Sequence, residues 1–153
     1  MVTVWWLASE VIHYNFLCPG ETITAQKYCH EIDKVHQELQ RLRPALVNRK
    51  GPLLLHDNAR PHVSQMTLQN LNELAYETLP YPVYLPDLCP TNYHFLRRFD
   101  NFLQEKVSNN KGATQKASEE FIDSRTLGSY ATGINKLVYC WQKCVDYSGS
   151  YFV

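Results

Sequence analysis

Two polar segments of the chain carry the residue types that metal-dependent chemistry uses. The first is the run His56-Asp-Asn-Ala-Arg-Pro-His62, and the second is Leu85-Pro-Asp-Leu-Cys-Pro-Thr-Asn-Tyr-His-Phe95. Asp57 ends a short apolar run, at the carboxyl end of a predicted strand, where open α/β sheets collect their ligands. Asn92 follows 35 positions later, near the start of a predicted helix. A strand–helix–strand–helix order can therefore bring these two side chains to one edge of the sheet.

Four segments have the composition of strands. Residues 2–7 and 11–17 are rich in β-branched and aromatic side chains, and they predict two adjacent antiparallel strands that form a hairpin. The apolar run 52–57 predicts a buried strand, and residues 76–79 predict another. These strands are the elements that must position the two polar segments.

Helices are expected where apolar residues recur at intervals of three and four. The first helix is expected to start at Glu21-Thr22 and to be interrupted at Pro44, and the second to start at Pro61. A third should begin after Pro90, with Thr91 as its cap. Two more are expected over 114–125 and 133–146, and a solvated loop over 107–113. One buried helix face is expected from the spacing of Tyr28, Ile32, Val35, Leu39 and Leu42. The next two expected helices carry Leu68, Leu71 and Leu74, and Phe95, Phe99 and Phe102. In the last helix, the residues expected to face inward are Ile134, Leu137, Val138 and Trp141. The order of elements predicts an α/β fold with a mixed sheet covered by helices.

Composition excludes several classes of protein. The 153 residues carry 15 Lys and Arg against 15 Asp and Glu, so net charge gives no argument for nucleic-acid binding. No apolar run approaches the roughly 18–20 residues that span a bilayer, and the start lacks the pattern of a signal peptide. Five cysteines without a C-x-x-C pair predict reduced thiols in the cytosol or nucleus.

The two polar segments together resemble the catalytic domain of mariner-family DNA transposases. The resemblance extends over essentially the whole chain. It includes Val2-Thr-Val-Trp-Trp6, Ile12-His-Tyr14, Pro19-Gly-Glu-Thr-Ile23, Phe99-Asp-Asn-Phe-Leu103, Ala131-Thr-Gly-Ile-Asn-Lys-Leu137, Trp141-Gln-Lys-Cys-Val145 and Ser148-Gly-Ser-Tyr-Phe152. The resemblance implies an RNase H-like fold and, as ancestral activity, metal-dependent cleavage and joining of DNA strands.

The same resemblance implies a site for two divalent ions, Mg²⁺ or Mn²⁺, held by three acidic residues that activate water or a DNA 3′-hydroxyl. It carries the second acid onto Asp57 and the third ligand position onto Asn92. Asn92 departs from the Asp of active members. A neutral amide offers one carbonyl oxygen and no charge, so it binds Mg²⁺ more weakly than a carboxylate does.

In the family, the first acid lies on a strand that precedes the one matching Val2–Trp6, and no residue of this sequence receives it. We therefore expect residues 1–153 to form a truncated RNase H-like catalytic domain from the second strand onward. The expected mixed sheet lacks its first, central strand, and no helix-turn-helix DNA-binding domain is expected within the chain.

Basic residues near the two segments are candidates for contacts with DNA phosphates. Arg60 and His62 belong to the first motif, although Arg60 could equally pair with a nearby acid, and the histidines could support the loop by packing. The remaining candidates are Arg41, Arg43, Arg49, Lys50, Arg97 and Arg98, for which a solvated basic face is the alternative interpretation.

The sequence thus predicts a nuclear remnant of a mariner transposase that is catalytically inactive and binds no productive metal pair. Two alternatives stay open. One is a non-enzymatic domesticated module that binds DNA, binds DNA-repair or replication proteins, or forms a homodimer. The other is residual DNA nicking. No partner in a membrane is expected.

Overall fold

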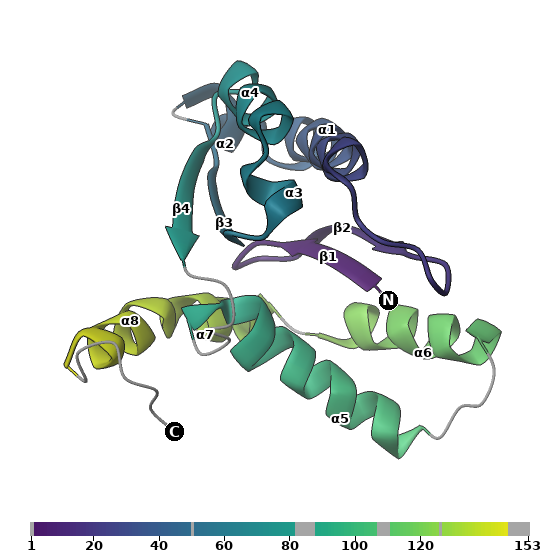
Figure 1. Ribbon diagram of the computed structural model, residues 1–153. Coiled ribbons are helices and arrows are strands. Elements are labelled where there is room, and N and C mark those ends of the chain that lie inside the picture. Colours follow the sequence, from purple (N-terminus) through teal and green to yellow (C-terminus); the bar gives the residue numbers. More distant parts are fainter. Residues whose placement is uncertain (1, 50, 82–87, 107–110, 126, 147–153) are drawn as a thin grey trace. The chain divides into compact units, whose positions relative to one another are not determined.

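The computed structural model describes residues 2–49, 51–81, 88–106, 111–125 and 127–146. The chain divides into two compact units (Figure 1). The first comprises Met1–Trp5 and Ile12–Tyr84, and the second comprises Trp6–Val11 and Leu85–Val153.

The strands form two small sheets. Strands β1 (Val2–Trp6) and β2 (Val11–Phe16) pair with each other, and the Leu7 N–H donates to the Glu10 carbonyl at 2.8 Å in the turn between them. The hairpin prediction is therefore confirmed. Strands β3 (Leu53–Asp57) and β4 (Glu77–Tyr81) pair in parallel, with Asp57 opposite Tyr81 at the end of the ladder.

Within the described residues, β1 pairs only with β2 and β3 only with β4, so the strands form two sheets and not one continuous mixed sheet. The prediction that β3 is buried throughout is wrong, because Leu53 is 60% exposed and only His56 of this strand is buried.

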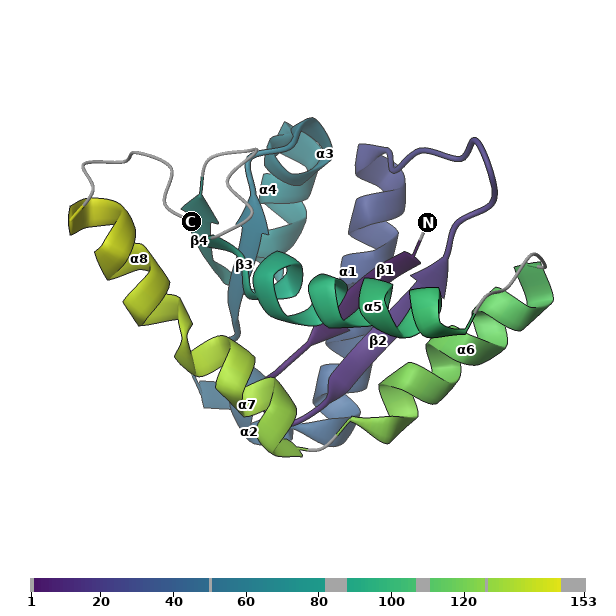
Figure 2. The same cartoon turned by 90° about the horizontal axis from the view of Figure 1, so that it is seen from below.

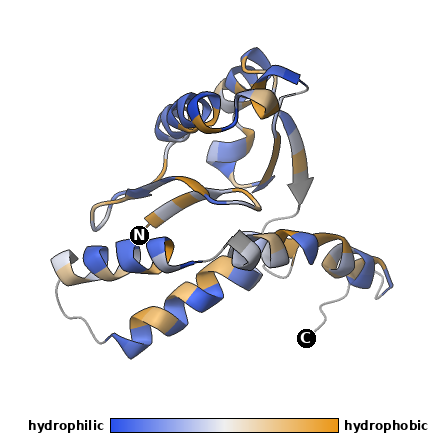
Figure 3. Cartoon of the chain, turned by 180° about the vertical axis from the view of Figure 1, so that it is seen from behind, coloured by the Kyte–Doolittle hydropathy of each residue, from blue (hydrophilic) through white to orange (hydrophobic). Residues whose placement is uncertain are grey.

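The long helix α1 (Ala25–Leu42) covers both sheets of the first unit. Its buried face carries Tyr28 and Ile32, which cluster with Leu71. Trp5 of β1 and Leu54 of β3 both pack against this cluster, so one helix face joins the two sheets. Figure 3 shows hydrophilic and hydrophobic residues alternating along the helices, as this one-sided burial requires.

A buried carboxylate that the apolar pattern did not predict also ties α1 to the hairpin. Glu31 is 7% exposed, and its Oε2 accepts a hydrogen bond from Thr3 Oγ1 at 3.2 Å. Its Oε1 accepts from Asn15 Nδ2 at 3.0 Å, and His13 Nε2 lies 3.3 Å from Oε2. These polar partners offset the cost of burying the charge.

Three short helices complete the first unit: α2 (Pro44–Arg49), α3 (Arg60–Val63) and α4 (Gln65–Glu73). The helix expected from residues 21–22 begins at Ala25, because the Thr24 hydroxyl caps it by accepting the Lys27 N–H. The helix expected from Pro61 is divided at Ser64, whose hydroxyl caps α4. Leu68 of α4 is 50% exposed, whereas Leu71 is buried.

The second unit is helical. It contains a π-helical turn η2 (Thr91–Leu96) and the helices α5 (Arg97–Glu105), α6 (Lys111–Ser124), α7 (Leu127–Asn135) and α8 (Leu137–Asp146). Helices α5 and α6 pack together (Figure 2). The Phe121 ring, 1% exposed, lies 5.6, 5.3 and 5.3 Å from the rings of Phe95, Phe99 and Phe102.

Several predictions for the second unit need correction. Thr91 does not cap its helix, because Pro90 before it already has helical dihedrals. The loop expected at 107–113 gives way to α6 from Lys111, and residues 107–110 lie outside the described part. The helix expected over 133–146 is two helices, and Val138 is 79% exposed instead of facing inward.

Two further observations concern the chain as a whole. All five cysteines are free thiols. Among the described residues, no helix combines the length and the apolar character needed to cross a bilayer.

Candidate functional site

The end of β3 places the Asp57 carboxylate at a tight turn. Its Oδ1 accepts a hydrogen bond from the Ala59 N–H at 3.0 Å, the short-range turn that Asp side chains favour. The same oxygen accepts from His62 Nδ1 at 2.7 Å. The side chain stays 29% exposed. Asp57 is therefore fixed at one oxygen while part of its carboxylate faces solvent.

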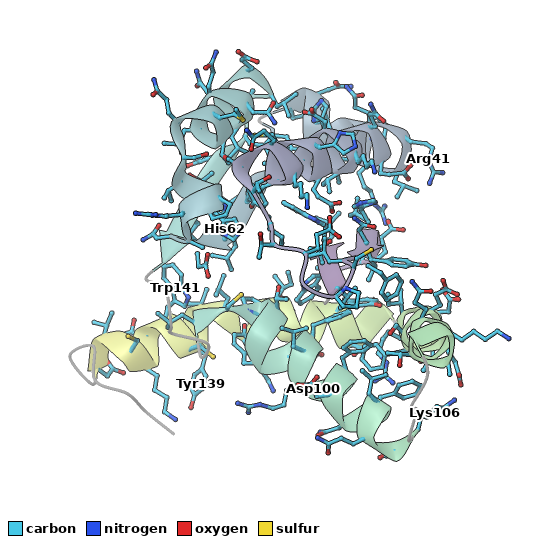
Figure 4. The ribbon with its side chains drawn as sticks, turned by 45° about the vertical axis from the view of Figure 1, so that its right-hand side comes forward. Arg41, His62, Asp100, Lys106, Tyr139 and Trp141 are labelled. Carbon is cyan, nitrogen blue, oxygen red and sulfur yellow. The ribbon has the colours of Figure 1, made fainter. Side chains whose placement is uncertain are left out.

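An aromatic stack orients His62, which belongs to α3. Figure 4 labels the His62 side chain. The rings of His62 and His56 lie 5.3 Å apart and within 9° of parallel. The Tyr28 ring lies 4.3 Å from the His62 ring. Tyr28 and His56 are themselves buried, and Tyr28 Oη shares a hydrogen bond of 2.8 Å with His56 Nδ1.

The two buried groups of the stack, His56 and Tyr28, are neutral at pH 7. Burial, with a smaller contribution from His62, lowers the pKa of His56 to about 4. Burial, helped by the negative charge of Asp57, raises the pKa of the Tyr28 hydroxyl above its ordinary value. Neutral partners avoid the cost of placing charges in the core, and they leave Asp57 as the anionic group at this end of β3.

Asn92 lies in η2, the π-helical turn of the second unit. Such turns occur frequently at functional sites. The residues on either side of Asn92 are anchored: Thr91 Oγ1 accepts from Trp6 Nε1 at 3.0 Å, and the Tyr93 hydroxyl donates to the Gly133 carbonyl at 2.7 Å. These contacts hold the backbone that carries Asn92.

His94, a residue of the same turn, is buried. It is 5% exposed, and its ring lies 6.3 Å from the Trp6 ring, with 23° between the planes. A Cβ at Gly133 would lie 2.5 Å from the His94 ring, so only glycine leaves the ring room. Burial is the largest cause of the lowered pKa of His94. Sequence reasoning missed Trp6 and Gly133 as supports, because both are distant in sequence from Asn92.

Asp57 belongs to the first unit and Asn92 to the second. Their convergence on one edge therefore stays a prediction. Asp57 Oδ2, which no hydrogen bond within the described residues uses, has the hard oxygen chemistry that Mg²⁺ and Mn²⁺ prefer. The donor set fits one largely hydrated ion. Among the described residues, no group of three or more His, Cys, Asp or Glu side chains is arranged to hold a metal.

Arg60 lies beside this site, exposed at the first position of α3. It lines a shallow hollow of about 450 Å³ together with Ala25, Pro61, Val63 and Ser64. Within the described part of the chain, Arg60 forms no ion pair with an acid, and its contact with DNA phosphate stays a prediction.

The other basic candidates differ in their surroundings. Arg41, 67% exposed at the end of α1, is already paired with Glu38 at 2.8 Å (Figure 4). Arg98 donates to Ser129 Oγ at 3.0 Å. Arg43, Arg49 and Arg97 are exposed at helix ends, and Lys50 lies outside the described residues.

Comparison with known proteins places the chain. The family model described as transposase (partial DDE domain) matches residues 1–49. The human histone-lysine N-methyltransferase SETMAR is 62% identical over 152 residues, 99% of this chain and 22% of that protein. The Mos1 mariner transposase of Drosophila mauritiana is 34% identical over 152 residues, covering 99% of this chain and 44% of the transposase. The chain thus spans well under half of these two relatives.

Solved structures agree with the sequence matches. The Mos1 transposase catalytic domain with raltegravir and Mg superimposes with a TM-score of 0.93 at 35% identity, covering 99% of this chain and 76% of that one. A pre-cleavage Mos1 transpososome gives a TM-score of 0.92 at 34% identity, covering 99% of this chain and 45% of that chain. These matches confirm the predicted RNase H-like α/β fold. The chain therefore belongs to the mariner transposase family, and its residues match part of the catalytic domain.

Proposed function

We propose that the chain is a remnant transposase domain that contacts the DNA backbone without cleaving or joining strands. One residue carries this proposal: the neutral Asn92 at the position where the family motif places its third acid. Structures of the related Mos1 domain were determined with Mg and with Mn, which supports divalent metals as the family's cofactors. For this chain, we propose that no productive metal pair forms.

The physical reason is electrostatic. Two divalent ions about 4 Å apart repel each other by roughly 16 kcal/mol at an effective dielectric constant of about 20, four times the value for unit charges. Shared carboxylates offset this repulsion, and an amide contributes no charge to that offset. Among the described residues, the carboxylate at the end of β3 is that of Asp57, and its Oδ1 already accepts two hydrogen bonds.

When bound, a divalent ion would polarise the phosphodiester and the attacking water. Two residues of the chain itself would contribute to binding. The Asp57 carboxylate would orient one hydrated ion, and the exposed Arg60 guanidinium would hold a DNA phosphate next to it. Mos1 relatives are found in complexes with transposon ends, which supports DNA as the ligand class.

We propose that DNA binding is weak and sensitive to salt. The chain has no net charge, so attraction to DNA depends on local basic groups such as Arg60, Arg49 and Arg97. Each phosphate contact adds about 0.9 to the slope of log affinity against log salt concentration. Because chromosomal DNA lies in the nucleus, a DNA-binding role would be exercised there, and we propose a nuclear localisation.

A nicking assay tests the proposal. Supercoiled plasmid is incubated with Mn²⁺ and purified wild-type protein or its Asp57→Ala variant. We expect equal, background-level conversion to open circles, with DNA binding retained in both proteins. Nicking by the wild type that disappears in Asp57→Ala would contradict the loss of cleavage. Protein partners retained at high salt in a pull-down, with no DNA binding, would instead favour a protein-interaction module.

A further inference from the structure

We propose that His62 is a positioning residue that holds the Asp57 carboxylate with Oδ1 turned into the protein and Oδ2 as the single oxygen open to a divalent cation. The inference rests on the proposed role of Asp57 as a metal ligand and deepens it. His62, which the sequence suggested as a candidate for DNA contact, is thereby assigned to positioning Asp57.

Two hydrogen bonds hold Oδ1 of the Asp57 carboxylate. The Ala59 N–H and His62 Nδ1 both donate to this oxygen, at 3.0 and 2.7 Å. The backbone donor fixes the turn, and the imidazole donor fixes the rotation of the carboxylate about its last bond. His62 Nδ1 also lies 3.3 Å from the Asp57 carbonyl oxygen, so this one ring nitrogen contacts both the side chain and the backbone of Asp57.

The orientation of His62 is determined by the two rings on which it packs. His62 keeps 21% of its side chain exposed, and its ring rests on His56 and Tyr28, which are 7% and 5% exposed. Those two residues come from β3 and α1 and are joined by a hydrogen bond of 2.8 Å. The buried pair therefore determines the plane of the imidazole that reaches Asp57.

The consequence concerns metal affinity. A carboxylate whose Oδ1 is engaged by two donors binds an ion through one oxygen, and the ion keeps water as its other ligands. Without the His62 donor only the Ala59 N–H would hold Oδ1, so the carboxylate would be less well oriented and ordering it on binding would weaken affinity. Loss of such supporting hydrogen bonds lowers metal affinity by about 10–100-fold in other proteins.

Two substitutions separate the hydrogen bond from the packing of the ring. His62→Phe keeps an aromatic ring against Tyr28 and His56 but removes the donor. His62→Asn keeps a side-chain N–H within similar reach of Asp57 but removes the ring. Asp57→Asn removes the metal-binding charge, and His30→Ala changes an exposed histidine of α1 as the matched control.

The measurement is Mn²⁺ titration of the ¹⁵N-labelled chain, followed by paramagnetic broadening of the amide signals of residues 57–62. Circular dichroism confirms that each variant is folded. We expect His62→Phe to weaken Mn²⁺ binding by about 10–100-fold, while His62→Asn and His30→Ala stay within about threefold of wild type. Asp57→Asn should abolish the broadening.

The outcomes distinguish the inference from the assignment on which it rests. Wild-type affinity in His62→Phe, with broadening lost in Asp57→Asn, would overturn the role of His62 and leave Asp57 as the ligand. Weak binding in His62→Asn with normal binding in His62→Phe would show that ring packing matters and would also overturn the proposal. Unchanged broadening in Asp57→Asn, or none in the wild type, would overturn both assignments.

Discussion

The surroundings of Asp57 and Asn92 are built in different ways. The partners that touch the Asp57 carboxylate, Ala59 and His62, lie within five positions of it in the sequence. The turn that carries Asn92 is held by Trp6 and Gly133, which are 85 and 40 positions from their partners Thr91 and Tyr93. A local motif thus supports one candidate ligand, and distant core contacts support the other.

The comparison has a consequence for how each region fails. Because the Asp57 site depends on local hydrogen bonds, a substitution there should change metal binding more than folding. Because the backbone around Asn92 depends on the aromatic core of the second unit, a core substitution should disturb that turn together with global stability. The changes expected from four substitutions, and from acid, can break or sharpen this distinction.

The largest effect is expected from Phe121→Ala. Phe121 is 1% exposed at the centre of the phenylalanine cluster, and truncation of such a residue costs about 3–5 kcal/mol. Urea unfolding gives the free energy, and amide hydrogen exchange should place the lost protection mainly in η2, α5 and α6. The control is Val138→Ala, since Val138 is 79% exposed and should matter by less than about 0.5 kcal/mol. Equal losses in the two variants would contradict the described core.

Gly133→Ala should have an intermediate effect. The new Cβ would meet the His94 ring at 2.5 Å, and overpacking of this kind costs about 1–3 kcal/mol. The helix preference of Ala offsets about 1 kcal/mol of this. Gly128→Ala in the same helix is a matched control, because nothing lies within 4 Å of its Cβ and it should stabilise slightly. Chemical unfolding that ranks the two variants in the opposite order would remove Gly133 as a support of η2.

Acid should destabilise both regions, through one buried histidine in each. The pKa of His56 is lowered to about 4, and that of His94 is lowered as well. An unfolded chain binds protons at histidine near pH 6.5, so it binds more protons than the folded state below that pH. For His56, stability should therefore be full above about pH 6.5 and fall toward about pH 4, by at most about 1.4 kcal/mol per pH unit. The lowered pKa of His94 should change stability in the same direction.

His56→Gln separates the two contributions to this pH dependence. The variant keeps a polar group for Tyr28 and removes the titration in the first unit, so its stability should depend less steeply on pH. Urea unfolding at several pH values measures the slope. An unchanged slope would assign the acid sensitivity to other groups.

The smallest effect is expected from Arg60→Ala, an exposed residue whose loss should leave stability within about 0.5 kcal/mol. The slope of log affinity for DNA against log salt concentration should fall by about 0.9. Arg41→Ala is the matched control, because Glu38 already pairs with Arg41 and little change in the slope is expected. Identical slopes for the wild type and Arg60→Ala would exclude a phosphate contact at this position.

Local patterns predicted the elements and the first motif well, because hydrophobic spacing directly reports a one-sided face. The hairpin and the buried face of α1 with Tyr28 and Ile32 are examples. The same spacing misplaced Val138, because periodicity identifies an apolar stripe without showing that any element packs against it. Whether a single residue is buried could therefore be determined only from the three-dimensional fold.

Long-range contacts account for what the sequence did not predict at the site. Thr91 was expected to cap a helix, and its hydroxyl instead accepts from Trp6, 85 positions away. The stack of His62 on His56 and Tyr28 similarly joins α3, β3 and α1. Such contacts depend on tertiary placement, which single-residue preferences and spacing do not report.

The central claim is that a single anionic ligand at the end of β3 does not support paired metal ions. Anomalous diffraction from crystals of the protein soaked in Mn²⁺ tests it most directly. We expect one weakly occupied ion, bound to Asp57 Oδ2 and otherwise to water. Two well-occupied ions beside Asp57 would contradict the claim.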